Sequence, residues 1–210
     1  AAGDAWVTPG YHKRSDPASE FARDHIRTLK QSGEVGKLRY VRVTMPAGDW
    51  IAGGFEGLID ASDPYPESVA EERPADLDEA AYAEYVKFVN YYIHQVNYVN
   101  FLLDEDYEIT YADPSGVLLA GVSDSGVAVA IEMSPYETSL DWQESALVGF
   151  AKGYVRGDLP PPLARNRAGT VEILRDAEQG LPPETTRPGM PSTHAMYAQA
   201  RNFVAAIRGE

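Results

Sequence analysis

Residues 107–133, YEITYADPSGVLLAGVSDSGVAVAIEM, contain three runs in which apolar residues alternate with polar or small ones. Alternation with a period of two is typical of a strand that buries one face. The segments DPSG and DSG, which separate the runs, have the composition of tight turns. The stretch therefore predicts an antiparallel meander with strands at 107–113, 116–123 and 127–133.

Periodicity extends the sheet in both directions along the chain. Further strands are expected at 5–11, 38–45, 139–150, 151–159 and 169–176, and those after residue 133 are expected to continue the meander. Helices are expected at 17–32, starting after Ser15-Asp16, at about 76–103 with Asp76 as its cap, and at about 192–208. Two segments are rich in Pro and Gly. Segment 46–75 is expected to form a long ordered loop or lid, and segment 180–191 is expected to be irregular. Helices beside one large, mostly antiparallel sheet give an α+β fold.

The third strand of the meander has two different faces. Val127, Val129, Ile131 and Met133 point one way, whereas Ala128, Ala130 and Glu132 point the other. With the helices on one face, the other face of the sheet needs a cover. A second copy of the same sheet would supply it, which predicts a homodimer or homotetramer. The alternative is a polar outer face in contact with water.

Within the long helix, the stretch KFVNYYIHQVN (87–97) has an unusual polar side. Lys87, Asn90, His94 and Asn97 fall within an arc of about 80°. An apolar stripe lies opposite, formed by Tyr85, Val89, Tyr92, Val96, Val99 and Leu103. Neutral amides and an imidazole in a row suit the wall of a cavity, and an ordinary exposed face is the alternative.

Composition excludes several classes of function. The chain has 210 residues, 32 of them acidic and 18 basic, so its formal net charge is −14. Nucleic acids and anionic membranes are poor partners for such a chain, because both require a positive surface. No cysteine is present, and the four histidines show no metal-binding spacing, so no metal site is expected. Residues 1–10 do not resemble a signal peptide, which together with the absence of cysteine favours a cytoplasmic protein.

Four stretches, in this order, resemble the C-terminal domain of the glucose-fructose oxidoreductase, inositol dehydrogenase and MocA family of NAD(P)-dependent oxidoreductases. GYHKRSDPASEFARDHIRTLKQSGEVG (10–36) is similar to the passage out of that family's dinucleotide domain. NYYIHQVN (90–97) resembles its active-site helix, and WQESALVGFAKGY (142–154) a strand and turn of its sheet. HAMYAQARNFVAAIRG (194–209) resembles its terminal helix.

The resemblance implies roles for individual residues. His94 matches the family's active-site histidine and would act as the acid or base, in agreement with the ordinary pKa of an imidazole. Substrate hydroxyls would be held by Asn90, Asn97 and Lys87, and Arg14 and Tyr11 would lie at the mouth of the site. The alternative for the two amides is a contact with the backbone of a nearby loop, and the alternative for the residues at the mouth is ordinary surface charge. The aromatic side chains that could stack on a sugar, or serve only as core anchors, are Trp50, Tyr136 and Trp142.

Two departures from the family pattern limit what this chain can do alone. Asn90 and Asn97 stand where many members of the family carry Asp, and an amide cannot polarise a hydroxyl as a carboxylate does. Neither a Gly-x-Gly-x-x-Gly fingerprint nor the family's Glu-Lys-Pro triplet occurs. Without the phosphate-binding turn, the chain is expected to bind no cofactor, although the complete enzyme would use NAD or NADP.

The sequence therefore leads to one hypothesis with an alternative. Residues 1–36 would be the remnant of a connection from a dinucleotide-binding domain, and residues 37–210 a domain for substrate binding and oligomerisation. The parent enzyme would oxidise or reduce a sugar or cyclitol, and this chain alone would be inactive. The alternative is a stand-alone carbohydrate-binding or assembly protein with the same fold; a cofactor-free lyase has little support.

Overall fold

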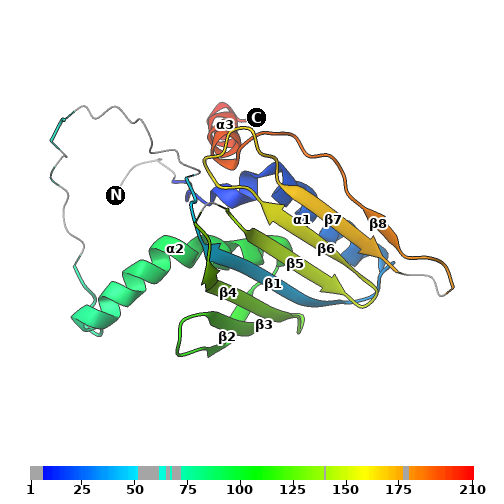
Figure 1. Cartoon of the computed structure of the whole chain (residues 1–210), viewed down its shortest axis with the longest axis horizontal. Coiled ribbons are helices and arrows are strands. Elements are labelled where there is room, and N and C mark those ends of the chain that lie inside the picture. Colours follow the sequence, from blue (N-terminus) through cyan, green and yellow to red (C-terminus); the bar gives the residue numbers. More distant parts are fainter. Residues whose placement is uncertain (1–6, 52–61, 65–66, 68–71, 140, 177–179) are drawn as a thin grey trace.

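Strand β1 (Leu38–Ala47) lies inside an eight-stranded sheet of order β2-β3-β4-β1-β5-β6-β7-β8 in the computed structural model (Figure 1). The structure describes residues 7–51, 62–64, 67, 72–139, 141–176 and 180–210. The other strands are β2 (Tyr107–Ala112), β3 (Leu118–Ser123), β4 (Ala128–Glu137), β5 (Glu144–Phe150), β6 (Gly153–Leu159), β7 (Thr170–Arg175) and β8 (Glu184–Thr186). The helices are the 3-10 helix η1 (His12–Ser15), α1 (Pro17–Ser32), α2 (Glu79–Leu103) and α3 (Ala195–Arg208).

The predicted meander of β2, β3 and β4 is confirmed, and β5, β6 and β7 also pair antiparallel in sequence order, but the predicted step from β4 to β5 is wrong. β4 does not pair with β5, because β1 lies between them, parallel to β4 and antiparallel to β5. Val41, Val43 and Met45 of β1 are buried, as expected for a strand with neighbours on both sides. The crossover from β1 to its parallel neighbour contains α2, β2 and β3, so α2 is held close to the centre of the sheet.

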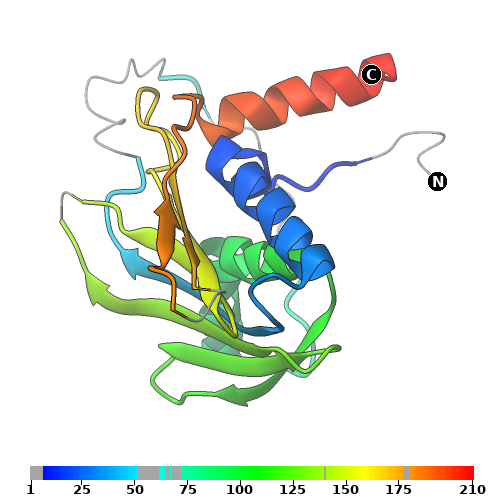
Figure 2. The same cartoon turned by 90° about the vertical axis from the view of Figure 1, so that its right-hand side faces the viewer.

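One face of the sheet forms the core together with α1 and α2. Val127, Val129, Ile131 and Met133 are buried, and the residues between them are exposed or half-buried, which confirms the predicted alternation. α1 packs on β6 and β7, α2 packs on β1 and β4, and the two helices contact each other. Figure 2 shows these helices on the same side of the sheet. The predicted α+β fold class is confirmed; a role for the other face in oligomerisation stays a prediction.

The helix ends follow local capping rules. The Asp16 carboxylate accepts a hydrogen bond from the Ala18 amide at 2.9 Å, and Pro17 occupies the first helical position of α1. For α2 the cap is Asp78, which accepts from the Ala81 amide at 2.8 Å, and the predicted cap, Asp76, is wrong. Residues 74–77 form a turn, with the Leu77 amide bonded to the Pro74 carbonyl, so the helix begins later.

Three further expectations need correction. Residues 7–11 form no strand, and the chain enters η1 directly, with buried His12 and Lys13; residues 5 and 6 lie outside the described residues. β8 pairs with β7 inside segment 180–191, which the sequence predicted to be irregular. α3 begins at Ala195 instead of 192. Most of the predicted lid, at 52–61, 65–66 and 68–71, lies outside the described residues.

Candidate functional site

A cavity of about 810 Å³ lies where η1, the end of β1, the middle of α2 and the start of α3 meet. This volume is within the range of small-molecule sites, and its wall contains both apolar and polar side chains. The wall has polar or amphipathic side chains from several elements, namely those of His12, Lys13, Trp50, Asn90, Tyr91, His94, Trp142 and Gln199. The apolar part includes Met45, Pro162 and Met196.

His94 occupies the wall of this cavity on α2 and is half-buried. Its ring lies 4.6 Å from the ring of His12, centroid to centroid, in an edge-on arrangement, and 6.2 Å from that of Tyr11. Burial lowers the pKa of His94, and the nearby Lys13 ammonium lowers it further, while Glu144 acts in the opposite direction. The ring is therefore neutral at neutral pH and can accept a proton.

A buried cluster of Lys13, Gln95 and Glu144 lies next to the two histidines. Their exposed fractions are 5%, 0% and 1% respectively. The Lys13 ammonium forms an ion pair with one oxygen of Glu144, and Gln95 Nε2 donates to the other at 2.8 Å. The same ammonium lies 5.8 Å from the centre of the Trp142 ring. The charge of Lys13 is thus balanced inside the protein, with Trp142 beside it in the cavity wall.

The structure divides the predicted site residues into three groups. Asn90 and His94 line the cavity, as do the stacking candidates Trp50 and Trp142. Tyr11, Arg14 and Asn97 line a separate cavity of about 340 Å³ along α3, where Arg14 Nε donates to Asn97 Oδ1 at 2.6 Å.

Two of the candidates line neither cavity. Lys87 is exposed on α2 and Tyr136 is exposed at the end of β4, where its hydroxyl donates to Gln143 at 2.7 Å. The helical arc from Lys87 to Asn97 is therefore a continuous surface of which only the middle faces the cavity.

Sequence reasoning missed the buried cluster and His12, although two signals were available. Glu144 occupies an inward position in the alternation of Glu144, Ala146, Val148 and Phe150, all four of which are buried in β5. Gln95 is one and two helical turns from Tyr98 and Leu102, which are both buried. A polar residue at a core position needs a buried partner, and that requirement could have directed attention to both side chains.

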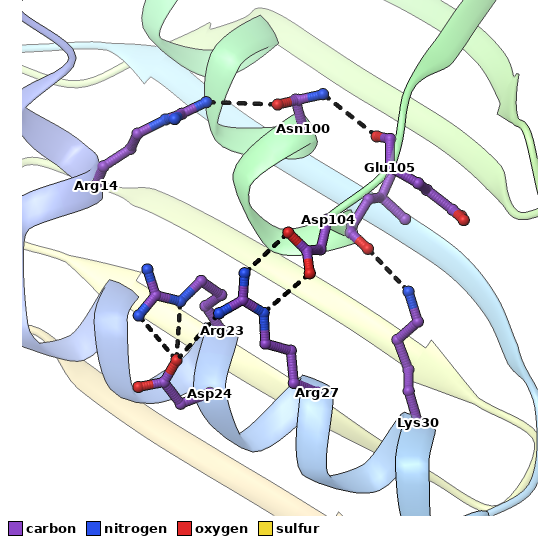
Figure 3. A network of polar contacts seen from close by, with 9 residues as sticks. Arg14, Arg23, Asp24, Arg27, Lys30, Asn100, Asp104 and Glu105 are labelled. Atoms are coloured by element: carbon purple, nitrogen blue, oxygen red, sulfur yellow. Dashed lines mark hydrogen bonds and ion pairs between the residues drawn. The ribbon is translucent and has the colours of Figure 1, made fainter.

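A surface network lies on another side of η1 and α1, at the C-terminal end of α2 (Figure 3). It consists of Arg14, Arg23, Asp24, Arg27, Lys30, Asn100, Asp104 and Glu105. Arg27 forms two hydrogen bonds to Asp104, at 2.8 and 3.0 Å, and Lys30 donates to the Leu103 carbonyl at 2.9 Å. Arg14 donates to Asn100 at 3.4 Å in addition to Asn97, so its guanidinium belongs to this network and not to the large cavity.

The described residues contain neither a metal-binding cluster nor a membrane-spanning helix. Among the described residues, no group of three or more His, Cys, Asp or Glu side chains is arranged to hold a metal ion. Within the same part of the chain, no helix has both the length and the apolar character needed to cross a bilayer.

Comparisons with known proteins give matches among solved structures only. No family model matches the chain, and no curated protein is found as a relative. A putative NADPH-dependent oxidoreductase from Desulfitobacterium hafniense is similar with a TM-score of 0.63 and 11% identity, over 96% of this chain and 55% of that one. For an oxidoreductase domain protein from Kribbella flavida, the TM-score is 0.59 and the identity 16%, over 95% and 57%.

A third similar structure is KijD10, a 3-ketoreductase from Actinomadura kijaniata in complex with TDP-benzene and NADP. Its TM-score is 0.57 and its identity 12%, over 97% of this chain and 54% of that one. The chain thus spans about half the length of the proteins it resembles. Identities this low establish the fold and leave substrate and activity to be argued from the site. The chain therefore shares its α+β fold with about half of each of these oxidoreductases, in agreement with the fold that the sequence resemblance implied.

Proposed function

We propose that this chain is the substrate-binding half of an NAD(P)-dependent oxidoreductase that acts on a hydroxyl group of a sugar or cyclitol. The observation that carries the proposal is the cavity, because it combines a neutral histidine, an amide and two tryptophans on a fold that oxidoreductases share. Residues 1–36 would then connect the chain to a dinucleotide-binding half, with residues 37–210 as the substrate-binding domain.

The described residues do not fit the cofactor itself. A dinucleotide needs a glycine-rich turn between a strand and the N-terminus of a helix. Here Gly33 caps α1, while Gly116 and Gly126 lie in hairpin turns. The first turn of α2 begins with Asp78 and Glu79, whose charges oppose a pyrophosphate. We therefore assign cofactor binding to the other half of the enzyme.

The role of this chain would be to orient the reacting hydroxyl and to exchange its proton. The His94 side chain lines the cavity, so we assign the proton transfer to its ring. A neutral imidazole accepts the proton when the alcohol is oxidised and returns it when a carbonyl is reduced. Asn90 would bind a neighbouring hydroxyl from the same wall of the cavity.

A non-catalytic carbohydrate-binding or assembly protein is the second candidate. The observation that favours it is the charge of the wall: Lys13 is the one charged side chain among the described residues that line the cavity, and none of them is a carboxylate. An adjacent carboxylate would raise the pKa of His94 and strengthen it as a base, whereas burial lowers that pKa here.

Binding experiments on the isolated chain test whether it binds sugar and leaves the cofactor to the other half of the enzyme. NADH fluorescence should not change on titration with the protein, while glucose or myo-inositol should give saturation-transfer NMR signals. The variant His94→Gln should weaken sugar binding, and Lys87→Gln, on the same helix outside the cavity, should leave it unchanged. Micromolar NADH binding would contradict the assignment of the cofactor to another half.

An activity assay separates the two candidates. When this chain is joined to its dinucleotide-binding half, His94→Gln should lower kcat about 100-fold or more, and KM should rise only by the factor by which the variant weakens sugar binding. A binding or assembly protein would bind the same sugars with no NAD(P) reduction in that assay.

We also expect a homodimer or homotetramer and a cytoplasmic location. Support for self-association comes from apolar side chains exposed on β2 and β3, namely Ile109, Tyr111 and Val122. Light scattering should give a mass at least twice the 23.0 kDa of one chain. A mass of one chain in light scattering would contradict the expectation that a second copy covers the open face of the sheet.

A further inference from the structure

His12 shares the wall of the large cavity with His94, but no role was assigned to it by the sequence. It belongs to η1, its exposed fraction is 7%, and its ring is the one that meets His94 edge-on. Only Asp16, the cap of α1, separates η1 from α1, so the position of η1 and its His12 ring is tied to that helix. The two rings therefore form a pair built from elements far apart in the sequence.

Each ring of this pair has one buried nitrogen without a partner among the described residues. These atoms are Nε2 of His12 and Nδ1 of His94. In a neutral imidazole one nitrogen donates and the other accepts, so Nε2 of His12 can pair with a ligand hydroxyl in either tautomer. Nε1 of Trp142 is a third buried nitrogen without a partner among the described residues of the same wall. A buried polar atom left unpaired costs about 1–3 kcal/mol, so these atoms together point to a ligand with polar groups.

The charges around the pair restrict the chemistry of that ligand. Burial lowers the pKa of His12 to about 3, with the Lys13 ammonium and His94 adding to the effect, so the ring is uncharged at neutral pH. The Lys13 ammonium is already paired with Glu144, whose second oxygen accepts from Gln95. An anionic ligand would therefore meet no free cation in the described wall and would approach the Glu144 charge.

The remaining wall favours a ring with an apolar face. Trp142 lies beside Lys13, and Met45 and Met196 are further apolar members of the lining. The flat C–H face of a pyranose or cyclitol stacks on such a surface, while its edge presents adjacent hydroxyls. A hydroxyl can accept or donate at Nε2 of His12 and at His94, as the tautomer of each ring requires.

We propose that His12 is a second ligand-binding residue, which acts with His94 to bind adjacent hydroxyl groups of an uncharged sugar or cyclitol stacked on Trp142. The inference rests in part on the proposed function, which supplies the carbohydrate class, and adds both the residue and the restriction to uncharged ligands. Sugars that carry a carboxylate or phosphate at these positions would be excluded by the wall.

Imidazole ring signals in ¹H–¹⁵N NMR spectra test the proposal on the chain as it is. Titration with glucose or myo-inositol should shift the signals of His12 and His94 along one binding curve. His25 is the internal control, because it lies on α1 outside the cavity. Its ring is held by a hydrogen bond of 2.7 Å between Nε2 and the Arg175 guanidinium. Glucuronate and glucose 6-phosphate should bind at least about tenfold more weakly than glucose.

Variants test His12 without relying on assignment of the signals. His12→Phe keeps a ring of similar size and removes both nitrogens, and should weaken glucose binding about tenfold. His12→Gln, which can place an amide near Nε2, should recover part of that loss. His25→Phe is the matched control and should bind as the wild type does. Circular dichroism reports whether each variant is folded.

The outcomes distinguish this inference from the proposed function. If the signal of His94 moves and that of His12 does not, the role of His12 is wrong while the sugar site at His94 stands. If charged sugars bind as tightly as glucose, the restriction to uncharged ligands is overturned. If neither ring responds to any sugar, the proposed function fails and the inference fails with it.

Discussion

The buried cluster and the surface network place similar charges in opposite surroundings. In the buried cluster, Lys13 and Glu144 are almost entirely removed from water and connect η1 to β5. In the surface network, Arg27 and Asp104 connect α1 to the end of α2, with 41% and 52% of their side-chain surfaces exposed (Figure 3). Both hold elements that are distant in sequence, but water competes strongly only for the second pair.

This difference decides what each cluster contributes. Water screens an exposed pair, so its loss changes the free energy of unfolding little. A buried pair costs desolvation energy when it forms, but removal of one partner leaves the other charge buried without compensation. The fold can therefore lose one surface contact, whereas it depends on the complete buried cluster, which also supports the wall of the candidate site.

The largest effect is expected for Glu144→Ala, which leaves the Lys13 ammonium unpaired in the core. We expect the free energy of unfolding to fall by about 3–5 kcal/mol, as measured by urea denaturation. Glu132→Ala, on the opposite face of the same sheet, is the matched control and should cost much less. The double variant Lys13→Met, Glu144→Leu should recover more than half of the lost free energy of unfolding. If Glu144→Ala is as stable as the wild type, the pair is not ionised.

The next effect is a dependence of stability on pH that comes from His12 and Asp16. Burial lowers the pKa of His12 from 6.5 to about 3, so between these values the unfolded chain binds more protons than the folded one. Stability from His12 is therefore fully present above pH 6.5 and is lost as the pH falls towards 3. Burial raises the pKa of Asp16 from 3.8 to about 6, so its contribution is present below pH 3.8 and is lost as the pH rises through 6.

Two variants separate these opposing contributions. Between pH 5 and pH 7, the free energy of unfolding of His12→Phe should rise by about 2 kcal/mol less than that of the wild type. Asp16→Asn should rise by more than the wild type, because it removes the opposing group. Urea denaturation at both pH values measures each change, and equal pH dependence in His12→Phe and wild type would rule out a buried neutral His12.

How far the sequence could predict this molecule depends on the range of the interactions. Alternation in 107–133 and capping at Asp16 are local, so the meander and the start of α1 were predicted correctly. Strand order is not local: β1 is separated from β4 and β5 by about 80–100 residues, and no local signal places it between them. Hydrophobic pattern alone cannot choose between neighbours in a sheet.

The candidate site shows the same limit. The polar side of α2 was recognised, yet its residues were treated as one surface, whereas Asn90 and His94 face the large cavity and Asn97 faces Arg14. The apolar stripe was right at Val99 and Leu103, which are buried, and wrong at Tyr85, which is 53% exposed. The N-terminal turns of α2 extend past the sheet, so packing is not available to bury them (Figure 1).

A buried hydrogen bond between two uncharged groups should have an effect on stability between those of the two clusters. Ser19 Oγ donates to the Tyr98 hydroxyl at 3.1 Å, and burial raises the pKa of Tyr98, so the phenol stays protonated. Tyr98→Phe should lower the free energy of unfolding by about 1 kcal/mol, measured by urea denaturation. Tyr111→Phe removes a hydroxyl from a tyrosine that is 51% exposed and should have no measurable effect. A loss of several kcal/mol in Tyr98→Phe would mean that the hydroxyl also supports the charged cluster.

The smallest effect is expected for Arg27→Ala in the surface network, despite the two well-formed hydrogen bonds to Asp104. The hydrogen bonds from the guanidinium lower the pKa of the Asp104 carboxyl, but water surrounds both groups. We expect the Tm to fall by less than about 2 °C at low ionic strength, and by less still in 1 M NaCl, where the charges are screened. Differential scanning calorimetry of Arg27→Ala, Asp104→Ala and the double variant measures the coupling between the two side chains. A coupling as large as that between Lys13 and Glu144 would mean that exposure does not separate the two clusters, and that geometry at the end of α2 matters more than contact with water.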